Sequence, residues 1–211
     1  MKVLAVLSQK GGVGKTTLAT CLAVAAEAAG KRTALFDLDP QATASFWKDV
    51  RPSETPAVQS VQAVRLPAML EAAQAAGADL AIVDGAAVAR DVAFQAAECA
   101  DFALIPTRAA VFDSMSMVHT IEIVKQAGKP YAIVLNFVPP RGQETGDALA
   151  TAEELGAPIC PVFIGNRKAF FRAQSAGLAV QEHDPRSKAA SEIQQLYDYT
   201  IIHLYSDEAV S

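Results

Sequence analysis

"LSQKGGVGKTTLATCLAVAAEAAG" occupies residues 7–30 and joins a short apolar run to an alanine-rich stretch. Three glycines and two lysines, Lys10 and Lys15, fall within six consecutive positions of it. Glycines let the backbone curl so that successive N–H groups point inward and form a nest for an anion. A helix that begins there adds the positive end of its dipole. The stretch therefore predicts a phosphate-binding loop between a strand and a helix.

Two side chains of this loop have expected roles beyond the backbone cradle. Lys15 is expected to neutralise the β- and γ-phosphates of ATP, and the Thr16 hydroxyl is expected to ligate Mg²⁺. The predicted phosphate-binding residues are Gly11, Gly12, Val13, Gly14, Lys15, Thr16 and Thr17.

The general loop pattern GxxxxGK[ST] requires a glycine where this chain has Gln9. An additional lysine, Lys10, stands instead directly before the glycine pair. A second cation beside a satisfied cradle is costly unless a further negative charge meets it. The nucleotide of a partner subunit supplies such a charge, as it does for an arginine finger that acts in trans. A solvated loop lysine is the alternative interpretation.

The composition places limits on the class of protein. With 211 residues and 51% hydrophobic residues, the chain can form one α/β domain with a sizeable core, and we expect a single domain over residues 1–211. Its apolar runs are shorter than the roughly 20 residues that cross a bilayer, and its three cysteines lack metal-ligand spacing. These features predict a cytoplasmic protein, and the net charge of −5 argues against a strongly basic nucleic-acid binder.

Short apolar runs alternate with alanine-rich segments along the chain. This alternation predicts an α/β fold with a single doubly wound, mostly parallel sheet and helices on both faces. The expected strands are Lys2–Ser8, Arg32–Asp37, Leu80–Asp84, Phe102–Pro106, Tyr131–Asn136 and Ile159–Phe163, and the expected helices lie near 15–29, 41–50, 66–77, 91–100, 113–127, 146–155 and 188–205.

Acidic residues end two of the expected strands, where the ligands of such sheets bind. Asp37 and Asp39 stand two positions apart before a proline, and Asp84 closes the run that begins at Leu80. Mg²⁺ prefers few carboxylates and several waters, so we expect one acid to hold metal-bound water and another to face the nucleophile. Asp39 is also placed to cap the next helix. Residues 85–91 are expected to form a switch segment that orders with ATP.

The segments "KGGVGKT" and "DLDPQ" resemble the deviant Walker A motif KGGxGK[ST] and the DxDPQ segment of the ParA/MinD family of ATPases. The resemblance covers nearly the whole chain and implies a P-loop NTPase that hydrolyses ATP with Mg²⁺. It implies that Lys10 reaches the partner's nucleotide in an ATP-dependent homodimer and that Asp39 assists the hydrolytic water. Asp37 and Asp84, with Thr16, are implied at the Mg²⁺ site.

The same resemblance suggests where the adenine base binds. Asn136, at the end of an expected strand, is placed like an amide that hydrogen-bonds adenine, and Pro161 lies where the family packs the ring. An asparagine that caps a loop is an equally good interpretation of Asn136.

Within the family, the chain looks like the short, ParF-like ParA type, because its phosphate loop begins too early for an N-terminal helix-turn-helix. Residues 189–211 contain no Lys or Arg, so we expect no membrane-binding helix. The family's non-specific DNA contacts correspond to Arg167, Lys168 and Arg172, for which a solvated charged face is the alternative.

The expected function is therefore plasmid or chromosome segregation on the nucleoid. Its stimulating partner would be a ParB-like or centromere-binding protein. One alternative is an orphan relative that positions a protein assembly or DNA-transfer machinery. The other is a metabolic P-loop enzyme, such as a dethiobiotin-synthetase-like ligase.

Overall fold

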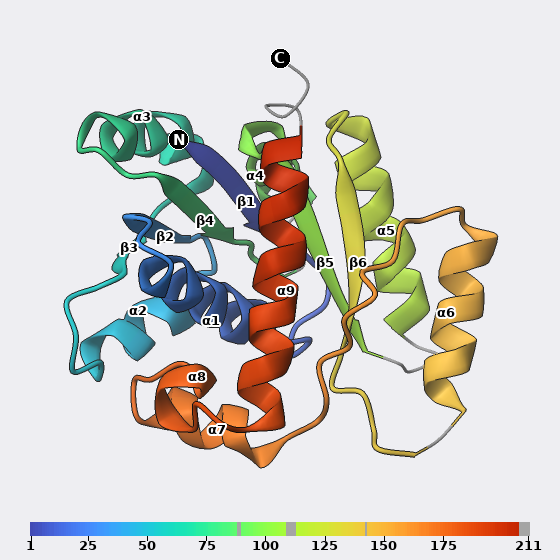
Figure 1. The fold of residues 1–211 in the computed structure, drawn as a ribbon. Coiled ribbons are helices and arrows are strands. Elements are labelled where there is room, and N and C mark those ends of the chain that lie inside the picture. The colour runs from blue at the N-terminus through green and yellow to red at the C-terminus, as the bar shows by residue number, and fades with distance from the viewer. Residues whose placement is uncertain (88–89, 109–112, 142, 207–211) are drawn as a thin grey trace.

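The computed structural model describes residues 1–87, 90–108, 113–141 and 143–206. Within these residues, parallel strands form one sheet (Figure 1). The strands are β1 (Lys2–Val6), β2 (Thr33–Asp37), β3 (Ala57–Ser60), β4 (Leu80–Asp84), β5 (Phe102–Arg108) and β6 (Tyr131–Asn136). Their order in space is β3-β2-β4-β1-β5-β6. The predicted doubly wound parallel sheet is confirmed.

Two parts of the strand prediction are wrong. β3 was not expected, because only Val58 of its four residues is buried and the edge strand shows no apolar run. Residues 159–163 do not form a strand, although the chain there lies beside β6. It makes only isolated bridges, Ile133 with Ile159 and Val138 with Gly165, and Pro161 between them has no N–H to donate.

Helices cover both faces of the sheet. They are α1 (Lys15–Ala28), α2 (Thr43–Asp49), α3 (Leu66–Ala75), α4 (Arg90–Cys99), α5 (Asp113–Gln126), α6 (Glu144–Glu154), α7 (Lys168–Ser175), α8 (Val180–His183) and α9 (Lys188–Tyr205), with a 3-10 turn, η1 (Ala63–Arg65), before α3. The expected helices all form, and α7 and α8 are additional.

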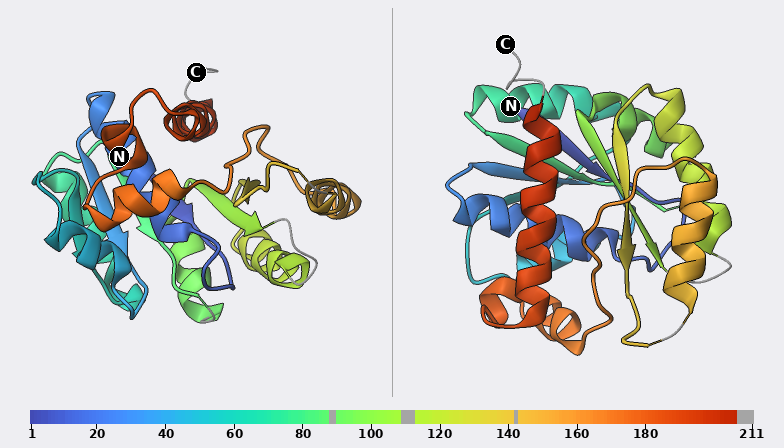
Figure 2. Two further views of the ribbon diagram at one scale, coloured as in Figure 1. Left: turned by 90° about the horizontal axis from the view of Figure 1, so that it is seen from below. Right: turned by 45° about the vertical axis from the view of Figure 1, so that its right-hand side comes forward.

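Alternating side chains of the strands feed two hydrophobic cores. Leu4 and Val6 of β1 face a core shared with α1, α2, α7, α8 and α9, whereas Val3 and Ala5 face one shared with α3, α4, α5 and α6. The view from below in Figure 2 separates the two helical layers. Burial on both faces is what makes the strands apolar along their whole length.

The C-terminal helix α9 packs against the rest of the fold. It buries the side chains of Ile193, Leu196, Tyr197 and Leu204 at helical spacing and passes in front of the sheet in Figure 1. Among the described residues, no helix is long and apolar enough to span a bilayer. Residues 207–211, the end of the segment 189–211 that contains no Lys or Arg, lie outside the described part of the chain.

β1 lies inside the sheet, with strands on both sides of it. The phosphate loop follows β1 directly, β4 and β2 lie on one side of it, and β5 and β6 lie on the other. Because all strands run in the same direction, their carboxyl ends meet at one edge. The residues that follow these strands therefore flank the loop from two opposite sides.

Candidate functional site

The phosphate loop has the geometry of an anion cradle. Gly14, with φ of 90°, immediately precedes α1, and this left-handed conformation favours glycine. A Cβ on Gly14 would also collide with the Asn136 amide. The Lys15 side chain is only 6% exposed, and its Nζ donates a hydrogen bond to the Lys10 carbonyl at 3.1 Å. Burial lowers the pKa of Lys15, although nearby Asp84 and Asp39 oppose the shift.

Asp84 lies beneath the start of α1 and is wholly buried. Its Oδ2 accepts a 2.6 Å hydrogen bond from the Thr16 hydroxyl, while its Oδ1 is buried and has no hydrogen-bond partner. Burial raises the pKa of Asp84 to about 7, and the Thr16 hydrogen bond only partly opposes this. A cation at this point would satisfy the orphaned oxygen, so the residues present fit Mg²⁺.

The described residues contain no complete set of protein ligands for a metal ion. Within the described ranges, no three His, Cys, Asp or Glu residues form a cluster that could hold a metal ion. Mg²⁺ characteristically keeps several waters and takes further ligands from substrate phosphates.

Asp37, also wholly buried, organises the backbone that follows β2. Its Oδ1 accepts from the Asp39 N–H at 3.0 Å, and its Oδ2 accepts from the Ala44 N–H at 2.9 Å, at the start of α2. Burial raises the pKa of Asp37, and these backbone hydrogen bonds oppose the shift. Asp37 thus fixes the loop that carries Asp39 and orients α2. Its predicted support of Mg²⁺ stays a prediction.

A cavity of about 630 Å³ lies above these acids, at the mouth of the phosphate loop. Asp39 reaches it from the β2 side and accepts a 2.9 Å hydrogen bond from the Gln41 N–H. The lining residues are Gly11, Gly12, Gly14, Lys15, Thr16, Thr17, Asp39, Pro40, Gln41, Thr43, Ala87 and Phe137. The structure therefore brings the predicted loop residues and Asp39 together around one space. Val13 is buried beneath the loop.

The expected switch segment is only partly described. Gly85 is tied to β1 through a 3.0 Å hydrogen bond from its N–H to the Val6 carbonyl, and Ala87 lines the cavity. Residues 88 and 89 lie outside the described residues.

The two residues expected at the base are placed differently from one another. Asn136 is buried, and its Nδ2 donates to the Val13 carbonyl at 2.8 Å, so its amide holds the phosphate loop. Pro161 is exposed and is not among the cavity-lining residues described. Phe137, which sequence reasoning missed, lines the cavity instead. Its position directly after the strand-ending Asn136 was the available signal.

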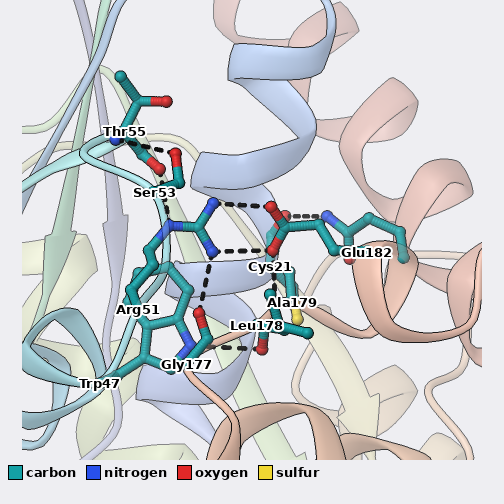
Figure 3. A network of polar contacts seen from close by, with 10 residues as sticks. Cys21, Trp47, Arg51, Ser53, Thr55, Gly177, Leu178, Ala179 and Glu182 are labelled. Atoms are coloured by element: carbon teal, nitrogen blue, oxygen red, sulfur yellow. Dashed lines mark hydrogen bonds and ion pairs between the residues drawn. The ribbon is translucent and has the colours of Figure 1, made fainter.

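The far end of α2 is fastened to the turn between α7 and α8 (Figure 3). The guanidinium of Arg51 makes a bidentate ion pair with Glu182, with N–O distances of 2.7 and 2.8 Å. It also donates to the carbonyls of Thr55 at 2.7 Å and Gly177 at 3.0 Å, and it stacks 4.6 Å from the centre of the Trp47 ring. α2 is thus fixed at one end by Asp37 and at the other by Arg51.

Helix α7 carries the residues that sequence reasoning connected with DNA. Lys168 and Arg172 are exposed on it, together with Phe171. Arg167 precedes the helix, and its guanidinium is paired with the buried Glu192 of α9 at 2.5 Å. Arg167 therefore fixes α7 against α9, and the exposed cations of this helix are Lys168 and Arg172.

A glycine cradle at a helix N-terminus, a buried lysine, and a Thr–Asp pair with a free oxygen define a phosphate-loop nucleotide-binding domain. A match to a protein-family model identifies the family to which this domain belongs. Its model, described as the CobQ/CobB/MinD/ParA nucleotide binding domain, matches residues 4–180. The chain belongs to this family, as the deviant Walker A motif indicated.

Similar proteins of known name include two with the same description. The chain is 36% identical over 200 residues to "Maintenance of carboxysome distribution protein A" of Gloeobacter kilaueensis, covering 93% of this chain and 90% of the relative. It is 31% identical over 216 residues to the protein of that name from Halothiobacillus neapolitanus, covering 94% and 95%. Among solved structures, MinD from Pyrococcus horikoshii complexed with Mg-ADP shares the fold with a TM-score of 0.79 at 18% identity, over 94% of this chain and 95% of that one.

Proposed function

We propose that this chain, as one domain over residues 1–211, is a Mg²⁺-dependent ATPase that positions a large intracellular cargo. The observation that carries the proposal is the cavity in which Lys15, Thr16 and Asp39 surround the space above the buried Asp84. The full-length similarity to two proteins named for carboxysome distribution supports the positioning role.

The residues of the cavity divide the catalytic work between them. Lys15 would hold the β- and γ-phosphate oxygens, and the loop N–H groups would bind the remaining charge. Thr16 and Asp84 would hold Mg²⁺, which neutralises charge on the phosphates during transfer. Asp39, held in place through its backbone by Asp37, would orient the attacking water. Catalysis here consists of positioning and electrostatic stabilisation.

Lys10 would complete the site of a second copy of this chain. Its carbonyl accepts the hydrogen bond from Lys15 Nζ, so its backbone is fixed by the same lysine that would bind the phosphates. A nucleotide gripped by Lys15 of one protomer and Lys10 of its partner explains why the additional lysine stands in the loop. Dimerisation would then depend on ATP.

Lys168 and Arg172 of α7 would bind DNA without sequence preference, and dimerisation would double the number of phosphate contacts. A partner protein bound to the cargo would stimulate hydrolysis and release the dimer from the nucleoid. The protein would then act in the cytoplasm, on DNA.

The relatives, rather than the loop motif, indicate the kind of cargo. Two relatives of nearly equal length carry a name that refers to a protein assembly, so a protein assembly is favoured over a plasmid or a chromosome. A metabolic P-loop enzyme remains a second candidate, because the family description includes CobQ and CobB. Such an enzyme has no use for DNA.

Sedimentation of the purified chain with ATP or ADP, each with and without random-sequence duplex, tests the proposal. We expect a dimer only with ATP and retention on DNA only as that dimer. A monomer that turns ATP over without binding DNA contradicts the positioning role and favours the metabolic enzyme. Fluorescent tagging in cells then identifies the cargo through the assembly that loses its spacing when the gene is deleted.

A further inference from the structure

The entry of the phosphate loop is tied to a helix that lies outside the cavity. After β1, the Leu7 N–H donates to the Leu104 carbonyl of β5 at 2.9 Å, as part of the sheet. Two residues later, the Gln9 N–H donates instead to the Thr120 hydroxyl of α5 at 3.0 Å, across 111 positions of sequence. The chain is therefore held by the sheet at Leu7 and by α5 at Gln9, immediately before Lys10.

Thr120 is a polar residue on the apolar face of α5. The buried apolar residues of this helix recur at helical spacing, at Met117, Ile121 and Val124. Thr120 lies among them and is 0% exposed. Its hydroxyl donates to the Ser116 carbonyl one turn earlier at 2.7 Å, which is the usual contact of a helical threonine. The hydrogen bond that it accepts from Gln9 is additional, and it joins α5 to the loop.

The backbone of Lys10 is fixed from both directions. The residue before it is tied to α5 through Thr120, and its own carbonyl accepts the 3.1 Å hydrogen bond from Lys15 Nζ. Its N–H makes a longer contact of 3.4 Å with Ser8 Oγ. These contacts set the point from which the Lys10 side chain extends.

Removing the Thr120 hydroxyl would leave the Gln9 N–H without its acceptor. A partly buried N–H in that state costs free energy until the segment moves to reach water or another oxygen. Lys10 is the next residue, so its backbone would move as well. A displacement of about 1 Å can cost a reacting group as much as 10²-fold in rate. The anchor therefore matters most for a side chain that has to reach another subunit.

We propose that Thr120 is a positioning residue, which holds the entry of the phosphate loop so that Lys10 meets the nucleotide of a second copy of this chain. The inference rests on the proposed function, in which Lys10 acts in trans. It adds a residue of α5 that is not among the described residues lining the cavity. Lys15 would bind the nucleotide of its own subunit with or without this anchor.

Thr120→Val tests the anchor, because it replaces the hydroxyl by a methyl group of similar size. Thr200→Val is the matched control. Thr200 of α9 is 1% exposed and donates to the Leu196 carbonyl one turn earlier at 2.7 Å, but within the described residues no hydrogen bond joins it to another element. Thr120→Ser keeps the hydroxyl and should behave like the unsubstituted protein.

Two measurements separate the positioning of Lys10 from damage to the loop. The affinity for Mg-ADP, measured by calorimetry, should stay within about twofold in every variant, because the loop of one subunit holds that ligand. Dimerisation is measured by sedimentation with Mg²⁺ and a non-hydrolysable ATP analogue. Thr120→Val should weaken it by roughly 5- to 150-fold, the range for an N–H that has lost its acceptor. Thr200→Val should leave it unchanged.

A variant of Lys10 shows whether Thr120 acts through that lysine. Lys10→Ala alone should weaken dimerisation. Adding Thr120→Val to it should cause little further loss, whereas the losses from two independent contributions would multiply. A threonine that merely stabilises the fold would not show this dependence on Lys10.

Three results would overturn the inference and leave the proposed ATPase standing. Unchanged dimerisation in Thr120→Val would mean that the anchor is not needed. An equal loss of Mg-ADP affinity in that variant would mean that Thr120 supports the cradle of its own subunit. A full further loss in the Lys10→Ala background, or no effect of Lys10→Ala itself, would mean that Thr120 does not act through Lys10. An unsubstituted protein that stays monomeric with the analogue would overturn the proposed function instead.

Discussion

Replacing Arg51 by methionine removes a charge that the fold has buried where α2 meets the turn between α7 and α8 (Figure 3). The Arg51 side chain is 3% exposed and that of its partner Glu182 is 30% exposed. Methionine keeps an apolar stem beside Trp47 and eliminates the ion pair and both carbonyl contacts. The carboxylate of Glu182 is then left without its cation.

The size of the effect follows from this burial. Removing one member of a buried ion pair costs about 3–5 kcal/mol, because the remaining charge is stranded. Since Glu182 keeps some contact with water and a 2.8 Å hydrogen bond from the Ala179 N–H, we expect the lower end, about 3 kcal/mol. For a chain of this length, that loss lowers the melting temperature by about 6–12 °C.

The assay is urea unfolding followed by Trp47 emission and by far-UV circular dichroism. Trp47 is the single tryptophan and is 2% exposed, so its emission reports the loss of this region, and the dichroism reports the helices. The matched control is Arg32→Met, which breaks the exposed Arg32–Asp79 pair at 3.6 Å. Exposed pairs contribute little, so the control should unfold like the unsubstituted protein.

A double-mutant cycle isolates the ion pair. Glu182→Gln removes the carboxylate charge, and the double variant with Arg51→Met no longer strands it. The double variant should therefore be less destabilised than the sum of the single variants, by about 1–3 kcal/mol. If Arg51→Met unfolds like Arg32→Met, or if the two single effects simply add, the buried pair does not stabilise the fold as reasoned.

The pH dependence gives an independent check. Burial alone would raise the pKa of Glu182, but hydrogen bonds from Arg51 and the Ala179 N–H, with the charge of Arg51, lower it. A carboxyl whose folded-state pKa is lowered stabilises the protein above its unfolded-state pKa, and this contribution disappears as the pH falls through the folded-state value. The difference between the unsubstituted protein and Arg51→Met should therefore be largest near neutral pH and shrink in acid. A difference that does not depend on pH would exclude the charge as its cause.

Three further sets of substitutions test the proposed catalytic residues and the proposed DNA surface. Lys15→Ala should weaken nucleotide binding by roughly 100-fold, since hydrogen bonds to charged groups contribute up to about 3 kcal/mol; undiminished calorimetric affinity contradicts the phosphate role. Asp39→Ala should keep ATP binding and dimerisation while phosphate release slows by about 10²- to 10⁴-fold, so normal turnover would remove Asp39 from the mechanism. Lys168→Glu combined with Arg172→Glu should abolish retention on DNA at low salt and preserve basal ATPase; unchanged retention would move the DNA surface away from α7.

Much of the candidate site was predictable because its signals are local. The glycine loop, Lys15 and Thr16 lie within a few residues of one another, and Asp37 and Asp84 each end an apolar strand. A parallel sheet brings all carboxyl strand ends to one edge, so identifying the strands was sufficient to bring these residues together.

The errors occurred where local signals were weak or misleading. The edge strand β3 has a single buried residue, and the apolar run 159–163 lies beside β6 without continuous pairing. The family resemblance placed Arg167 with Lys168 and Arg172 at a DNA surface, which stays a prediction, but it did not indicate that the Arg167 guanidinium binds Glu192, 25 positions further along the chain. Sequence proximity carried no information about that pairing.

By itself, the sequence determined the parallel, doubly wound class of the sheet, the phosphate loop and the family, because each depends on neighbouring residues or on a short period of apolar ones, whereas the edge strand β3 does not. Only the tertiary structure decided that Asn136 holds the loop through Val13, that Arg108 lies against the Phe137 ring, and that Arg51 joins Glu182. These last two partners are 131 residues apart. Such contacts depend on how the layers of the fold pack together, and no pattern along the chain records that geometry.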